Sequence, residues 1–262
     1  DQIRAAEKYH SPTKEILSTF RRPADDFEYD KEVQNALQTL RDECITKIYV
    51  QPVDASRQDY SSVFDLSTAS GLENAYRMIY NVTQSFQAVA LLVLKYIPSL
   101  EMKEPYKNTP QRTFANYVRV VVDKTAEYGD RVSAVKVKVA EEKRHMLTMP
   151  FGGDLPIKTI DPFETTTLSG FIRKYTDHGG REDELIGKVK KQAIAMRQAL
   201  RKEGYDADMM AIDYIISNET DADGLPRLYF IETAHTFAGE EDFDKGTGLI
   251  GQYREGLLKI AQ

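Results

Sequence analysis

Three observations predict a mixed α+β fold of two lobes for this sequence. Helix-like and strand-like patterns alternate along the chain, which argues against an all-α or an all-β architecture. Two apolar runs flank Tyr128-Gly-Asp130, as is typical of an antiparallel hairpin. The segment 98–114 contains three prolines and no periodicity, so we place the junction between the lobes there. The expected lobes are residues 1–98 and 99–262.

The first half of the chain contains signals for three helices and three strands. Ser11 and Pro12 suit the N-cap and first position of a helix, which we expect to continue to about Phe20. Ser70 and Glu73 have capping-box spacing and open another helix. The elements expected here are helices at 11–20, from 30 and at 70–86, and strands at 46–50, 63–64 and 88–97.

The second half has the clearest helix of the sequence, from Arg181 to Glu203, and Gly204 ends it. Its apolar residues form one stripe at helical spacing, and they are Leu185, Val189, Ala193, Met196 and Leu200. The other elements expected here are strands at 117–122, 131–139, 210–216 and 228–233, and a last helix at 249–260.

Composition excludes several classes of function. The 262 residues are 41% hydrophobic and 29% charged, as in an ordinary soluble protein. The net charge of −6 with no basic block excludes duplex nucleic acid as the expected partner. The longest apolar run, Ala88 to Leu94, is too short to cross a membrane. The single cysteine, Cys44, excludes an internal disulfide and fits a reducing compartment, so we expect a cytoplasmic protein.

Two acidic residues lie in the middle of apolar, strand-like runs. Asp213 is in the run 210–216, Glu232 is in the run 228–233, and the turn-rich stretch 217–226 joins them. A buried carboxylate needs a positive partner. Two such acids on neighbouring strands could share a divalent metal. Alternatively, they face solvent or pair with a lysine or arginine.

The motif Asp221-Ala-Asp-Gly224 between the acids resembles a calcium-binding loop. Phe230 stands where the closing bidentate acid of such a loop would fall. We therefore expect a hairpin turn at this position.

Several landmarks follow one another in a recognisable order from about Lys14 to the C-terminus. They are a strand that ends in Gln51-Pro52, the strand 91–97, Arg119 on a strand, Gly152-Gly153, Asp213, Glu232, and the closing segment 239–248. In this order they resemble the ATP-grasp superfamily, in the branch of ribosomal-protein glutamate ligases and glutathione synthetases.

The resemblance implies an ATP-grasp-like α+β fold in which two lobes with mostly antiparallel sheets grip ATP in the cleft between them. It also implies a reaction in which ATP converts a carboxylate into an acyl phosphate, which an amine or thiol then attacks. In the family, acids at the positions of Asp213 and Glu232 hold Mg²⁺, and Arg119 matches an arginine that contacts phosphate. The positions implied to contact the nucleotide are Lys14, Gln51, Arg57, Leu94, Lys95, Tyr96 and Ile97.

The chain departs from the family at three places. Gln51 replaces a phosphate-binding lysine, and glutamine can donate a hydrogen bond but carries no charge. The loop 54–62 has no glycine, so side chains hinder a close approach of its backbone to phosphate. Arg57, within this loop, is an alternative cation. Ala234 replaces an asparagine that ligates metal in the family.

Two hypotheses remain. The first is a divergent ATP- and Mg²⁺-dependent carboxylate–amine (or thiol) ligase, whose partners are the nucleotide and a small-molecule or peptide carboxylate. The second is a catalytically inactive ATP-grasp-like scaffold that serves as a binding or structural protein, with a protein partner or a second copy of itself. Both acids and Arg119 favour the ligase, whereas the three departures favour the scaffold.

Overall fold

The structure, a computed structural model, describes residues 2–9, 12–21, 26–53, 62–84, 90–107, 113–125, 129–148, 153–177, 180–205 and 207–234. The chain forms two compact units. One comprises residues 14–97 and 142–161, and the other comprises 1–13, 98–141 and 162–262. We call them the four-stranded unit and the five-stranded unit after their sheets. The chain changes units after residue 97, near the expected junction. Residues 1–13, which we expected in the first lobe, belong to the five-stranded unit, and residues 142–161, which we expected in the second lobe, belong to the four-stranded unit.

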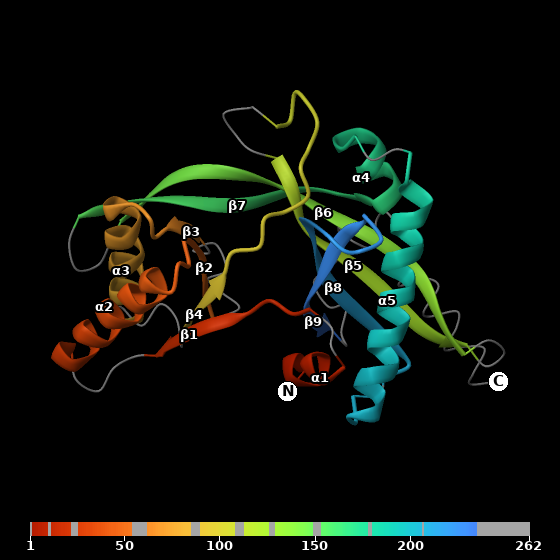
Figure 1. The fold of residues 1–262 in the computed structure, drawn as a ribbon, viewed down its shortest axis with the longest axis horizontal. Coiled ribbons are helices and arrows are strands. Elements are labelled where there is room, and N and C mark those ends of the chain that lie inside the picture. Colours follow the sequence, from red (N-terminus) through yellow and green to blue (C-terminus); the bar gives the residue numbers. More distant parts are fainter. Residues whose placement is uncertain are drawn as a thin grey trace. The chain divides into compact units, whose positions relative to one another are not determined.

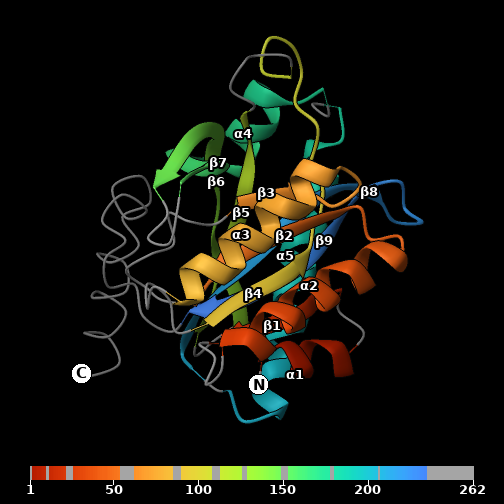
Figure 2. The same ribbon diagram turned by 90° about the vertical axis from the view of Figure 1, so that its left-hand side faces the viewer.

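The four-stranded unit has an antiparallel sheet in the order β1-β4-β2-β3. Helices α2 and α3 cover one face of this sheet (Figure 2). The buried apolar residues between these helices and the sheet form the core of the unit. Its elements are β1 (Ile16–Arg21), α2 (Asp26–Asp42), β2 (Lys47–Pro52), β3 (Ser62–Asp65), α3 (Ala69–Gln84) and β4 (Ala90–Lys95).

The five-stranded unit has a sheet in the order β7-β6-β5-β8-β9. The elements that contribute to it are α1 (Gln2–Lys8), β5 (Thr113–Thr125), β6 (Gly129–Thr148), β7 (Asp154–Thr167), α4 (Leu168–Tyr175), α5 (Glu182–Lys202), β8 (Met209–Thr220) and β9 (Pro226–Ala234). The part of β6 from residue 142 and the part of β7 up to residue 161 belong to the four-stranded unit. The long helix α5 lies along one face of the sheet (Figure 1). Leu185, Val189 and Leu200 of its predicted stripe are fully or almost fully buried there. The predicted mixed α+β fold with mostly antiparallel sheets is therefore confirmed.

The predicted helix at 11–20 is wrong. Residues 16–21 form strand β1, which pairs with β4, and Pro12 accepts a hydrogen bond from the backbone N–H of Phe230. The sequence Ser11-Pro12 is typical of a helix start, but the residues that follow include Ile16, Thr19 and Phe20, which favour an extended strand. Sheet pairing outweighs the local capping signal here.

Other elements differ from expectation in smaller ways. The structure adds α1, β7 and α4, which the sequence analysis missed. For α4 a signal was present, because its buried residues Leu168, Phe171, Ile172 and Tyr175 have helical spacing. Thr68, rather than Ser70, caps α3, because its Oγ1 accepts a hydrogen bond from the N–H of Gly71 at 3.0 Å. The predicted last helix at 249–260 lies outside the described residues. None of the helices described here is long and apolar enough to cross a membrane.

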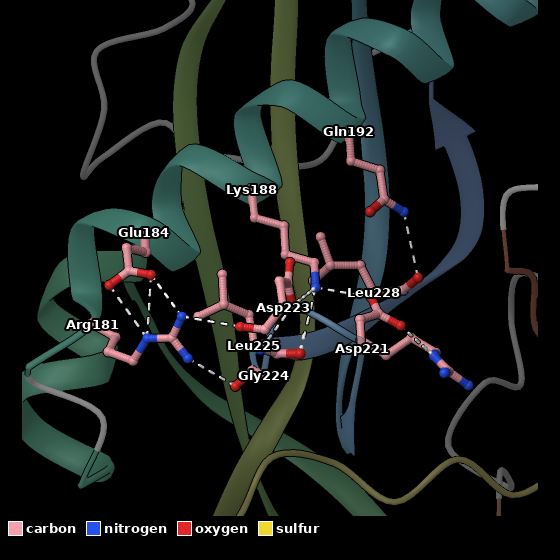
Figure 3. Close-up of polar contacts among 10 residues, drawn as sticks. Arg181, Glu184, Lys188, Gln192, Asp221, Asp223, Gly224, Leu225 and Leu228 are labelled. Carbon is pink, nitrogen blue, oxygen red and sulfur yellow. Dashed lines mark hydrogen bonds and ion pairs between the residues drawn. The ribbon is translucent and has the colours of Figure 1, made fainter.

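The turn between β8 and β9 is held by a polar strip along α5 (Figure 3). Arg181 donates hydrogen bonds to the carbonyl oxygens of Asp223 and Gly224, and Gln192 donates one to Leu228 O. Gly224 has a φ of 69°, a left-handed conformation that glycine adopts without steric penalty. The hairpin is thus fixed to the helix through its backbone.

Lys188 lies at the centre of this strip and explains the calcium-like motif. Its Nζ contacts Asp221 Oδ2 at 2.9 Å, Asp223 Oδ1 at 3.1 Å and Leu225 O at 3.4 Å. An ammonium group therefore occupies the position among these oxygens that a bound cation would take. The predicted hairpin turn is confirmed.

Candidate functional site

A row of charged residues crosses the five-stranded sheet. Arg119 on β5 lies directly opposite both Lys136 on β6 and Asp213 on β8. Asp213 in turn lies directly opposite Glu232 on β9. Directly opposed residues on antiparallel strands extend their side chains from the same face of the sheet. These four residues, which we call the charged row, therefore share one face.

The charged row lies on the face that α4 and α5 do not cover. Val118 and Val120, on either side of Arg119, are fully buried in the core together with residues of α4 and α5. Successive side chains of a strand point to opposite faces, so Arg119 points away from this core. The neighbours of Asp213 on β8 are buried in the same core, and Asp213 likewise points away from it.

An extra residue in β9 brings Glu232 into the charged row. The register between β8 and β9 shifts after Asp213: Asp213 pairs with Glu232, but Tyr214 pairs with Phe230. Ile231 is therefore the additional residue of a β-bulge, a feature that changes the direction of the side chains beyond it. Phe230 is fully buried in the core, and strict alternation would have placed Glu232 on that same core face.

Arg119 and Asp213 form a bidentate ion pair. Nε of Arg119 donates to Oδ1 of Asp213 at 2.8 Å, and Nη2 donates to Oδ2 at 2.7 Å. Arg119 is 5% exposed and Asp213 is 2% exposed. Burial raises the pKa of the Asp213 carboxyl, and the hydrogen bonds from Arg119 oppose that rise. Of the alternatives left open by the sequence, pairing with an arginine is the one observed for Asp213, while Glu232 is exposed.

Three further residues belong to the same face and were missed by the sequence analysis. Lys136 is 8% exposed, and burial lowers the pKa of its ammonium group. Tyr117 lies directly opposite Lys138. The Arg119 Cζ atom and the Lys138 Nζ atom lie 5.5 Å and 5.7 Å from the centre of the Tyr117 ring.

The signal for these lysines is present in the sequence. Val135-Lys-Val-Lys-Val139 alternates strictly between apolar and basic residues, which is typical of a strand with one face in a core. This strand is the partner of the one that carries Arg119. Together, Arg119, Lys136 and Lys138 place three cations beside two acids, an arrangement that suits an anion bound together with a divalent cation.

In the four-stranded unit, two other predicted residues come together. Lys14 donates a hydrogen bond from Nζ to Oε1 of Gln51 at 3.0 Å. Gln51 pairs with Leu92 across β2 and β4, while its neighbours Val50 and Pro52 are buried. The side chains of Gln51 and Lys14 therefore meet on the face away from α2 and α3.

The segment Leu94 to Ile97 begins within β4, a central strand of its sheet. Leu94 is 1% exposed, and Lys95 is exposed, with its Nζ 3.4 Å from Glu15 Oε2. The backbone N–H groups of Lys95 and Tyr96 donate to the carbonyl oxygens of Glu15 and Lys47. An adenine contact through either N–H would have to displace one of these bonds.

Arg57, the alternative cation, lies outside the described residues, and so does Gly152 of the predicted Gly-Gly step. Gly153 is described and has a φ of 65°.

Asp213 and Glu232 are the carboxylates of the charged row that could hold Mg²⁺, and both oxygens of Asp213 already accept hydrogen bonds from Arg119. Carboxylate oxygens are the ligands this ion prefers, and it is often bound by one or two carboxylates together with the phosphates of a substrate. Among the described residues, no three or more His, Cys, Asp or Glu side chains gather into a metal-binding group.

No protein-family model matches this chain, and no curated protein sequence matches it. Among solved structures, D-alanine–D-alanine ligase from Coxiella burnetii is similar, with 10% identity and a TM-score of 0.44. The ADP complex of N5-carboxyaminoimidazole ribonucleotide synthetase has 12% identity and a TM-score of 0.47, and biotin carboxylase from Campylobacter jejuni, in a complex with an ATP analogue, has 12% and 0.46.

The matches to these three structures cover 87%, 93% and 90% of this chain but 45%, 46% and 40% of theirs. The chain thus spans less than half the length of each. None of these structures reaches a TM-score of 0.5, so the resemblance to the ATP-grasp superfamily stays a prediction from the sequence landmarks. Likeness at this level identifies no activity for this chain.

Proposed function

We propose that this protein is a divergent ATP-dependent ligase, which joins a carboxylate to an amine or thiol through an acyl phosphate. The observation that carries the proposal is the charged row. Arg119 is 94 residues from Asp213 in the sequence, yet the sheet register sets Arg119 beside Asp213 and Asp213 beside Glu232 on the face away from the helices.

Each member of the charged row has a task in this proposal. Asp213 and Glu232 hold Mg²⁺, which supplies neutralising charge to the transferring phosphoryl group. Arg119 binds phosphate or acyl phosphate oxygens, because its planar fork of donors matches their geometry. Lys136 and Lys138 add positive charge that attracts the polyphosphate to this face.

In the four-stranded unit, Lys14 supports nucleotide binding. Gln51 stands where the resemblance implies a phosphate-binding lysine, and the ammonium of Lys14 lies 3.0 Å from its side-chain oxygen. Lys14 thus places a positive charge next to the position where the family has one. Leu94, Lys95, Tyr96 and Ile97 remain the proposed adenine contacts.

A second candidate function has an observation in its favour. In the structure both carboxylate oxygens of Asp213 are hydrogen-bonded to Arg119, so this acid is already neutralised without a metal. A protein that has lost the reaction but kept the fold would retain such a pair for stability. An inactive scaffold is therefore the alternative to the ligase.

Calorimetric titration with a non-hydrolysable ATP analogue and Mg²⁺ separates the two functions. The ligase predicts micromolar binding to the wild type and a loss of at least about tenfold in affinity for Asp213→Asn, which removes one metal-binding charge. Asp221→Asn is the matched control, because this acid lies in the turn of the same hairpin and pairs with Lys188 and Arg227. Its affinity should equal that of the wild type.

The absence of heat with millimolar nucleotide on the folded wild type would exclude the ligase and leave the scaffold. Equal affinities of the wild type and Asp213→Asn would place nucleotide binding elsewhere than on the charged row.

A further inference from the structure

The ion pair between Arg119 and Asp213 has a consequence for the order in which ligands bind. A bidentate arginine occupies the lone pairs that point out of the open end of the carboxylate, where a metal would also approach. The guanidinium also keeps a full positive charge next to any cation that approaches Asp213. As long as this pair persists, a divalent cation can reach Asp213 only through the remaining outer lone pairs of its carboxylate, and the charge of Arg119 opposes it there.

Burial makes this pair unfavourable to break without a replacement partner. Arg119 and Asp213 are 5% and 2% exposed, and separating a buried pair leaves a charge with neither water nor a counter-ion. A hydrated Mg²⁺ ion offers Asp213 a new partner but offers Arg119 none. A free divalent cation therefore binds poorly to the paired state.

An anion changes this balance because it offers Arg119 a partner. Phosphate and carboxylate groups accept the same two parallel hydrogen bonds that Asp213 accepts in the structure. Lys136 lies directly opposite Arg119, and Lys138 lies across from Tyr117 on the same two strands, so the side of Arg119 away from Asp213 is the positive one. An anion attracted there draws the guanidinium toward β6 and frees Asp213 beside Glu232.

We infer that Arg119 blocks metal binding at Asp213 and Glu232 until an anion takes its guanidinium, so that the anion binds before, or together with, the divalent cation. This inference rests on the proposed function for the identity of the natural anion, a nucleoside polyphosphate. It deepens that function by assigning a fixed order of binding, and it makes Arg119 a positioning residue for the acids as well as a phosphate contact.

The same sheet contains a matched control. Arg131 and Asp123 form a second bidentate pair, with Nε–Oδ1 and Nη2–Oδ2 distances of 2.7 Å and 3.1 Å. The Arg131 side chain is 58% exposed, and Asp123 lies opposite Met209 on β8 rather than opposite another acid. Removing Arg131 therefore changes a similar pair without freeing two neighbouring carboxylates.

The test is a titration with Mn²⁺ alone, in which electron paramagnetic resonance measures the free ion. Arg119→Gln should bind Mn²⁺ at least about tenfold more tightly than the wild type, because Asp213 loses its competing partner. Arg131→Gln should match the wild type. The double variant Arg119→Gln/Asp213→Asn should lose the gain. An affinity of Arg119→Gln equal to or weaker than that of the wild type would overturn the inference.

If Arg119→Gln does not fold, a measurement on the wild type tests the proposed order of binding instead. Sulfate imitates the geometry of phosphate and binds Mn²⁺ weakly, so at constant ionic strength it should tighten Mn²⁺ binding relative to chloride. Unchanged or weaker binding in sulfate would contradict the inference.

Different results would refute the proposed function and the proposed order of binding. A wild type that binds the ATP analogue with Mg²⁺, together with an unaltered Mn²⁺ affinity in Arg119→Gln, refutes the order of binding and leaves the function. A gain of Mn²⁺ binding in Arg119→Gln without any nucleotide binding in the wild type refutes the function and leaves the order of binding.

Discussion

Two buried arginine–aspartate pairs lie in the described part of the five-stranded unit, and their surroundings differ. Arg197 donates to Asp130 at 2.7 Å and also to the carbonyl oxygens of Ala207 and Asp208. Asp130 receives a second bond, from Arg201 at 2.9 Å. The Arg197 pair thus joins α5 to the start of β6 and to the segment before β8, all of which are structural contacts.

The Arg119–Asp213 pair is as deeply buried, but each member has a neighbour of its own charge. Lys136 lies opposite Arg119, and Glu232 lies opposite Asp213. Such neighbours do not stabilise the pair, and they suit an anion on one side and a cation on the other. Burial alone therefore does not distinguish the two pairs, whereas the presence of like-charged neighbours on both sides of the Arg119–Asp213 pair does.

The largest expected effect breaks the structural pair. Arg197→Met should lower the free energy of unfolding by about 3–5 kcal/mol, because Asp130 is left buried without its main partner. Urea denaturation measures the change, and nucleotide affinity of the folded fraction should stay at the wild-type value. A loss below about 1 kcal/mol would show that Arg201 alone satisfies Asp130.

The next effect concerns the Arg119–Asp213 pair. Asp213→Asn should lower the free energy of unfolding by only about 1–3 kcal/mol, since asparagine keeps the shape and one acceptor for Arg119. Its affinity for the ATP analogue with Mg²⁺ should fall by at least about tenfold. Asp130→Asn is the matched control and should show the opposite: lower stability with unchanged affinity.

The pH dependence of stability should reflect the structural pair. Burial tends to raise the pKa of Asp130, but the hydrogen bonds from Arg197 and Arg201 lower it below its ordinary value of 3.8. A depressed folded-state pKa stabilises the protein above the unfolded-state value, and this contribution disappears as the pH falls through the folded-state value. Urea denaturation between pH 7 and pH 2.5 should show a steeper decline below pH 4 for the wild type than for Asp130→Asn. Equal slopes would exclude Asp130 as a source of acid sensitivity.

The smallest effect concerns the strip on α5. Lys188→Met should lower the free energy of unfolding by about 1 kcal/mol, because the Lys188 side chain is 15% exposed and its two acidic partners are more exposed than that. Limited proteolysis in the turn 221–225 should become faster. Nucleotide affinity should not change, and a decrease like that of Asp213→Asn would mean that this strip serves the site as well.

Sequence periodicity was sufficient for those parts of the fold that depend on one face being buried. The stripe of α5 and the alternation at 135–139 report core packing directly, because a helix or strand places apolar residues at its own period. The prediction of a helix at 11–20 was wrong because it used a local signal for a segment whose structure depends on a distant partner. Ser11-Pro12 is a local signal, and the pairing of β1 with β4 is a contact with distant residues that no local pattern encodes.

The candidate site was only partly predictable for the same reason. Asp213 and Glu232 stand out as acids within apolar strands, and the superfamily resemblance adds Arg119. The bulge at Ile231 that turns Glu232 toward Asp213 has no sequence signal, because strict alternation would align Glu232 with Phe230. The contact between Lys14 and Gln51 joins residues far apart in the chain and appears only in the folded unit.

The central claim, that the charged row binds a nucleotide together with a divalent cation, is tested most directly by ligand-induced stabilisation. A ligand that binds only the folded state raises its stability by about 2.7 kcal/mol at one hundred times its dissociation constant. A non-hydrolysable ATP analogue with Mg²⁺ should therefore raise the melting temperatures of the wild type and of Asp130→Asn by similar amounts, and that of Asp213→Asn by clearly less. An unchanged melting temperature of the wild type at millimolar ligand, or an equal rise in Asp213→Asn, would contradict the claim.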